Sequence, residues 1–221
     1  MTTDAAPYDA HADWYEGYLN GPAARHTERT TRALASALGP GSGICLDLGC
    51  GTGRNAGSLR QLGWNVFGID RSLGQLRHAR HRLPVAAGDA ARLLLGSNCV
   101  DAAVATLIHT DVEDWKGTLR EIARVLRPGG RFVYVGVHPC FVGPFAERSS
   151  STVQIHPGYT SVGLTFEGPG VGTGIRARVG VRHLPLAALV NAVVGAGLML
   201  TRLDEPTDGP VPDLLVLEAV A

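Results

Sequence analysis

The sequence predicts an α/β fold with a doubly wound, seven-stranded, mostly parallel sheet whose last strand is antiparallel. From residue 20 onward, apolar runs of strand length alternate with helical patterns, and the runs are apolar on both faces, which is typical of a parallel sheet covered by helices. The last two runs are separated by residues 204–213, rich in proline and glycine. Such a segment cannot form the crossover helix that a parallel connection needs, so we expect these two strands to form an antiparallel hairpin.

The expected elements follow from periodicity and from start and stop signals. Gly39-Pro40-Gly41 end the first helix, Ser72 is a good N-cap, and Trp115, Leu119, Ile122 and Leu126 recur at helical spacing before Pro128-Gly129-Gly130. We expect helices over residues 24–38, 54–62, 72–82, 115–126 and 185–196. We expect strands over residues 44–48, 65–69, 84–87, 100–107, 131–137, 198–203 and 214–220.

The 221 residues are interpreted as one domain, because no composition break divides them. We assign residues 1–40 to an N-terminal helical cap, 41–137 to a ligand-binding core, 138–184 to a loop or lid on the substrate side, and 185–221 to a helix and hairpin. Glu147 to Gly174 is rich in Ser, Thr, Gly and Pro without a clear period. Such a segment is interpreted as a substrate-covering lid or as a floppy surface insertion.

Charge and composition argue against several classes of partner. The formal net charge is zero and no basic run is long, so neither a nucleic acid nor a membrane surface is expected as a partner. No apolar stretch reaches the length of a membrane span, and the N-terminus lacks a signal-peptide pattern. The four cysteines lack metal-ligand spacing, so we expect buried thiols, no metal site and a cytoplasmic location. The oligomeric state is left open.

A glycine-rich turn after the first strand is the strongest functional signal. The run Ile44 to Gly53 reads ICLDLGCGTG, an apolar strand followed by an acid and three alternating glycines. Glycine there permits unusual backbone angles and a bare surface for a ligand, while the following helix offers free N–H groups. The turn predicts a nucleotide-like cofactor.

Polar residues at the following strand ends complete the predicted site. Ligands of open α/β sheets bind outside the carboxyl ends of the strands. Asp70 ends the second strand and suits the two hydroxyls of a ribose, whereas Asp89 could accept a hydrogen bond from an exocyclic amine. Each acid taken singly is also a common turn or cap residue. The presence of acids at three successive strand ends, Asp47, Asp70 and Asp89, together with the glycine turn, weakens that alternative.

These motifs together resemble the class I S-adenosylmethionine-dependent methyltransferases, a family with a Rossmann-like sheet. The run from Leu46 to Gly53 is similar to their first motif, Asp70 to their ribose acid, Gly88-Asp89-Ala90 to their adenine motif, and Leu126-Arg127-Pro128-Gly129-Gly130 to the turn before their fifth strand. The resemblance covers roughly residues 40 to 140. It implies S-adenosyl-L-methionine as cofactor and S-adenosyl-L-homocysteine as product. The implied cofactor-binding residues are Asp47, Gly49, Cys50, Gly51, Gly53, Asp70, Arg71, Asp89, Ala90, Thr106, Leu107 and Tyr15.

A dinucleotide-dependent oxidoreductase is the main competing interpretation. That class prefers Gly-x-Gly-x-x-Gly, but here the third glycine comes one residue early and position 54 is Arg. The C-terminal hairpin also fits the methyltransferase sheet better than a purely parallel one.

Two histidines are candidates for a general base. His109 follows the fourth strand and His138 ends the fifth, and histidine titrates near neutrality. For each, hydrogen bonding to loop backbone is an equally good interpretation. Asp111, Glu113 and Asp114 are interpreted as caps of the next helix. Tyr15, with Tyr8 and Trp14, is expected in a segment folded over the cofactor.

The sequence therefore predicts an enzyme that transfers a methyl group from S-adenosylmethionine to a small-molecule acceptor, for example a secondary metabolite. Two alternatives stay open: a fold relative that binds the cofactor without methyl transfer, such as a cyclisation catalyst, and a non-catalytic binding protein. Neither the acceptor nor the atom that receives the methyl group follows from the sequence.

Overall fold

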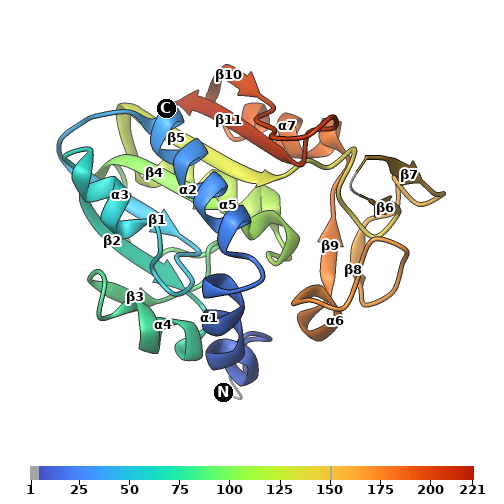
Figure 1. Ribbon diagram of the computed structural model, residues 1–221. Helices are drawn as coiled ribbons and strands as arrows, with labels where there is room; N and C mark the ends of the chain where they lie inside the picture. The colour runs from blue at the N-terminus through green and yellow to red at the C-terminus, as the bar shows by residue number, and fades with distance from the viewer. Residues whose placement is uncertain (1–4, 150) are drawn as a thin grey trace.

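The computed structural model describes residues 5–149 and 151–221, which form a central sheet with helices on both faces (Figure 1). The strand order is β10-β11-β5-β4-β1-β2-β3. The strands are β1 (Ile44–Leu48), β2 (Asn65–Asp70), β3 (Val85–Ala87), β4 (Val100–Thr106), β5 (Leu126–Val137), β10 (Met199–Asp204) and β11 (Leu214–Val220). The helices are α1 (Ala12–Asn20), α2 (Ala24–Leu38), α3 (Ala56–Gln61), α4 (Leu73–Ala79), α5 (Trp115–Val125) and α7 (Leu186–Gly195), preceded by a 3-10 turn η1 (Asp9–His11).

Parallel and antiparallel pairing divide the sheet as the sequence predicts. Strands β1 to β5 pair in parallel, β11 pairs antiparallel with β5, and β10 pairs antiparallel with β11. The predicted C-terminal hairpin and the seven-stranded mixed sheet are confirmed.

Two hydrophobic cores lie on the two faces of the sheet, as the alternation within each strand dictates. Cys45 and Val133 pack on the face covered by α2, α3 and α4. Leu46, Phe132 and Tyr134 pack on the face covered by α5 and α7. Strands that are apolar on both sides are therefore buried on both sides, which keeps the carboxyl ends of the parallel strands together at one rigid edge.

The segment between β5 and α7 is more regular than its composition suggests. It contains two small antiparallel hairpins, β6 (Ala146–Arg148) with β7 (Val153–Ile155) and β8 (Gly163–Thr165) with β9 (Val181–His183), and a short helix α6 (Arg176–Val179). The strands are too short for a period to be visible in the sequence. This segment forms a lobe beside the main sheet (Figure 1).

The largest departure from the expected boundaries lies between α5 and β5. Helix α5 ends at Val125, and β5 already begins at Leu126, where it pairs with Val100 before a register shift. The Pro-Gly-Gly turn therefore lies inside the irregular start of the strand.

Among the described residues, no helix is long and apolar enough to cross a membrane.

Candidate active site

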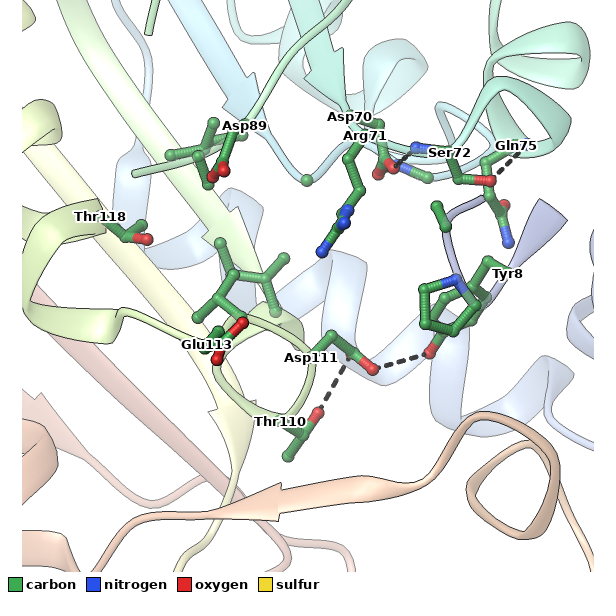
Figure 2. A pocket seen from close by; sticks show the side chains of 18 of the residues that line it. Tyr8, Asp70, Arg71, Ser72, Gln75, Asp89, Thr110, Asp111, Glu113 and Thr118 are labelled. Carbon is green, nitrogen blue, oxygen red and sulfur yellow. Dashed lines mark hydrogen bonds between the residues drawn. The ribbon is translucent and has the colours of Figure 1, made fainter. Parts of the chain in front are cut away.

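A cavity of about 510 Å³ opens at the carboxyl ends of β1, β2 and β4. Its wall comes from the N-terminal segment, the strand ends and the lobe, and Figure 2 shows its polar side chains converging on one space. Of the predicted cofactor residues, the cavity lining includes Gly49, Gly51, Asp70, Arg71, Asp89, Ala90, Thr106, Leu107 and Tyr15. Asp47, Cys50 and Gly53 lie outside the lining.

The three glycines of the turn have different local environments. Gly49, Gly51 and Gly53 all have positive φ, at 68°, 53° and 80°, which disfavours other residues. A side chain at Gly49 would overlap Ile108, and one at Gly53 would come within 2.6 Å of Leu83. At Gly51 the nearest atom to an added Cβ is Gln75 Oε1, at 3.7 Å. Gly49 and Gly53 thus allow close packing, whereas Gly51 presents bare backbone to the cavity.

Asp70 holds the turn and faces the cavity at once. Its Oδ2 accepts a hydrogen bond from the Gly51 N–H at 2.8 Å, and its Oδ1 accepts one from the Ser72 N–H at 2.9 Å. Burial raises the pKa of Asp70, and these two N–H donors oppose the rise. The carboxylate therefore has a fixed orientation and lone pairs left for a ligand.

Asp47 lies beneath the turn, fully buried. Burial raises the pKa of its carboxyl group to about 7. Asn55 opposes this rise only in part, because its amide Nδ2 donates instead to Thr106 Oγ1 at 3.2 Å. Neither carboxylate oxygen of Asp47 has a hydrogen-bond partner among the described residues. Asp47 is therefore a buried acid beneath the turn that does not contact the cavity.

Leu107 turns the chain at the end of β4. It has a φ of 61°, an unusual backbone conformation for a branched side chain. Its N–H donates to the Val135 carbonyl at 2.7 Å, and the following residues form the 3-10 turn η2 (Ile108–Thr110). This turn brings Leu107, Ile108 and Thr110 to the cavity.

An ion pair that the sequence did not predict joins the core to the lobe. Arg176 of α6 contacts both oxygens of Asp111, at 2.5 and 3.2 Å, and Tyr8 Oη donates to Asp111 Oδ1 at 3.3 Å. Although burial alone would lower it, the Asp111 carboxylate raises the pKa of Arg176 above its usual value. Figure 2 shows Asp111 between Thr110 and Tyr8. The cluster joins three segments around one side of the cavity.

Of the three acids expected to cap the next helix, one does so by its side chain. Asp114 Oδ1 accepts a hydrogen bond from the Gly117 N–H at 2.7 Å, at the start of α5. Asp111 instead pairs with Arg176, which lies 65 positions away. The sequence signal for this pair was the cluster of arginines after Gly174. A cluster of positive charges does not by itself identify the acid with which one of its arginines pairs.

The two candidate bases lie outside the cavity lining. His109 is 1% exposed and its Nδ1 is hydrogen-bonded with Tyr134 Oη in the core, where burial lowers its pKa to about 3. His138 is equally buried, accepts a hydrogen bond from the Cys140 N–H at Nδ1 and contacts Glu205 Oε1 through Nε2 at 2.5 Å. Both placements favour a structural role.

The N-terminal segment is fixed to the glycine turn by charge. Glu16 of α1 pairs with Arg82 at 2.6 Å and with Arg54 at 2.8 Å, and Arg82 also donates to the Thr52 carbonyl at 2.6 Å. Although burial opposes it, hydrogen bonding by the arginines lowers the pKa of Glu16 to about 2. Tyr8 and Tyr15 are held together, with ring centroids 5.2 Å apart, at the cavity wall. Burial raises the pKa of Tyr15 to about 12.

The described residues fit the cofactor that the motifs imply. Gln75 Oε1 is buried, lines the cavity beside Gly51 and has no hydrogen-bond partner within the described part of the chain. An unpaired buried acceptor is costly unless a ligand donor reaches it. Together with the fixed carboxylate of Asp70, it suits a ligand with hydroxyl and ammonium donors.

The chain is similar in sequence to known methyltransferases. Residues 46–134 match the protein family described as "Methyltransferase domain". The chain is 34% identical over 147 residues to the demethylmenaquinone methyltransferase of Renibacterium salmoninarum, covering 64% of this chain and 61% of that protein. The chain thus spans less than two thirds of this relative.

Solved structures show the same fold. The S-adenosylmethionine-dependent methyltransferase from Mesorhizobium loti has a TM-score of 0.69 at 24% identity, covering 86% of this chain and 95% of that one. The glycopeptide N-methyltransferase MtfA, complexed with S-adenosyl-L-homocysteine, has a TM-score of 0.64 at 20% identity, covering 87% and 88%. By its motifs and its sheet, the chain has the fold of the class I S-adenosylmethionine-dependent methyltransferases, and its residues 46–134 match a methyltransferase domain.

Proposed function

We propose that this protein transfers a methyl group from S-adenosylmethionine to a small-molecule acceptor. The observation that carries the proposal is the Asp70 carboxylate, fixed by the Gly51 and Ser72 N–H groups at the wall of a cavity that also contains the bare glycine backbone. When bound, the cofactor supplies a methyl group on a sulfonium, which is already strongly activated.

The proposal gives five residues of the lining a role in binding the cofactor. Asp70 would accept hydrogen bonds from the ribose hydroxyls, and Asp89, whose Oδ1 already accepts the Ala91 N–H at 2.9 Å, would accept one from the adenine amine. The backbone at Gly49 and Gly51, with Gln75 Oε1, would hold the methionine portion.

The chain's proposed contribution to the reaction is to align the methyl group with the acceptor in a site from which the bound ligands displace water. Tyr8 and Tyr15 have pKa values raised by burial, so both stay protonated at neutral pH; Tyr8 donates a hydrogen bond to Asp111, and the Tyr15 hydroxyl could donate one to a ligand. His109 and His138 lie outside the cavity lining, and we assign them no proton transfer. The lobe, with Leu164, Arg176, Val179 and Arg182 in the lining, is proposed to cover the acceptor. A cytoplasmic location is part of the proposal, since the four cysteines are free thiols.

Two measurements test the proposal. Titration calorimetry should detect S-adenosyl-L-homocysteine binding, and mass spectrometry should detect release of this product when cofactor and an acceptor panel are supplied. Because a relative is named for demethylmenaquinone, that compound belongs in the panel. Cofactor binding without product release on any acceptor would favour a non-methylating relative, and absence of binding would favour a non-catalytic protein.

A further inference from the structure

We propose that Arg182 binds an anionic group of the acceptor, so that the natural acceptor carries a carboxylate beside an apolar portion. This inference rests on the proposed function and names the acceptor class of the same cavity.

The β8–β9 hairpin directs Arg182 toward the cavity. Arg182 pairs with Leu164 in the antiparallel register, so both side chains project from the same face of the hairpin, and both line the cavity. Their neighbours Val181 and His183 are buried on the opposite face, where His183 packs with Tyr159 and Phe145 inside the lobe. The lobe's internal packing therefore fixes which face of the hairpin meets the ligand.

Charge on this wall is compensated at Arg176 but not at Arg182. Asp111 neutralises Arg176 through its two contacts. Arg182 is half-buried, and the described residues place no carboxylate oxygen within 4.0 Å of it. Of the other acids lining the cavity, Glu113 and Asp114 are exposed to water, and Asp114 is already hydrogen-bonded at the start of α5. A partly desolvated guanidinium without a counter-charge binds a carboxylate strongly, often in a bidentate geometry.

Aliphatic side chains lie next to this charge. Leu164 is 50% exposed, and Val179 of α6 lines the same cavity. Exposed aliphatic surface at a cavity wall suits the apolar body of a ligand. Among the described residues, the lobe side of the cavity therefore offers one cation without a paired carboxylate, Arg182, next to an apolar surface, which matches an aromatic or aliphatic acid.

The lobe also lies outside residues 46–134, the part that matches the methyltransferase family. The acceptor wall is thus contributed by a part of the chain that this match does not cover. The acceptor can differ from those of relatives that share the cofactor core.

The test measures binding of matched acids and esters. Wild-type protein, with and without saturating S-adenosyl-L-homocysteine, is titrated at pH 8 with 4-hydroxybenzoate, 4-hydroxycinnamate, 4-hydroxyphenylacetate and their methyl esters. We expect at least one acid to bind tenfold or more tightly than its ester. Arg182→Gln should remove this preference, Arg182→Lys should keep part of it, and S-adenosyl-L-homocysteine affinity should be unchanged in both variants.

The matched control is Arg178→Gln, which also removes one positive charge from the lobe. Arg178 lies in α6, stacks over Trp14 and is outside the cavity lining. It should leave the preference intact. Equal binding of acids and esters to the wild type, no binding of any acid, or a preference that survives in Arg182→Gln would overturn the proposal. Failure of the wild type to bind S-adenosyl-L-homocysteine would instead contradict the proposed function, and the titrations without it would still decide the role of Arg182.

Discussion

Replacing Asp70 with alanine tests the cofactor site most directly. In the free protein the change leaves the Gly51 and Ser72 N–H groups without their acceptor. An unpaired buried N–H costs about 1–3 kcal/mol. Water in the cavity can reach these groups, and removing a carboxylate whose pKa is raised by burial offsets part of the loss. We therefore expect the free energy of unfolding to fall by about 2 kcal/mol.

Ligand affinity should fall independently of stability. The ribose hydroxyls would lose charge-assisted hydrogen bonds worth about 1.5–3 kcal/mol, which corresponds to a roughly 10- to 150-fold weaker affinity for S-adenosyl-L-homocysteine. Calorimetry measures the affinity, and urea denaturation measures the stability.

Asp101→Ala is the matched control. Asp101 also accepts a backbone N–H, from Ile44 at 2.7 Å, but it lies outside the cavity lining. We expect it to lose stability while keeping its affinity for S-adenosyl-L-homocysteine. Unchanged affinity in a folded Asp70→Ala variant would refute the assignment of Asp70 to the ribose.

Three further predictions concern the turn, the lobe and the buried acid. Gly51→Val should abolish S-adenosyl-L-homocysteine binding with a near-native circular dichroism spectrum, because a β-branched residue resists a φ of 53° and its side chain occupies ligand space; wild-type affinity would place the ligand elsewhere. Replacing residues 147–174 with a Gly/Ser linker should leave S-adenosyl-L-homocysteine affinity nearly intact while methyl transfer collapses, because the proposed cofactor-binding residues lie outside this segment whereas its Leu164 lines the cavity; lost affinity in a folded variant would contradict this division. Burial raises the pKa of Asp47 to about 7 in the folded state, above its value in the unfolded chain. The free energy of unfolding is therefore highest below pH 4, where Asp47 is protonated in both states, and it falls as the pH rises toward 7. Asp47→Asn should therefore gain stability relative to the wild type across this range, by up to about 4 kcal/mol, and parallel pH profiles of the two proteins in urea denaturation would show that Asp47 does not titrate there.

Local signals in the sequence were sufficient for the sheet and for the strand-end residues that line the cavity. Apolar runs and turn residues located β1 and β11 at their observed bounds, and the glycines and Asp70 follow directly from motifs contained within a few residues of one strand. The carboxyl ends of parallel strands must meet at one edge, so adjacency of Asp70, Asp89 and Thr106 required no tertiary information beyond strand order.

The acceptor side depended on contacts between distant segments, which only the tertiary structure decides. The pairing of Asp111 with Arg176 and the shared face of Leu164 and Arg182 depend on how the lobe folds back on the core. Whether His109 faces the cavity or the core depends on the backbone angle at Leu107, which the sequence does not encode as a motif. Periodicity and local motifs determine which residues share a strand end, whereas long-range packing determines which side chains reach the ligand.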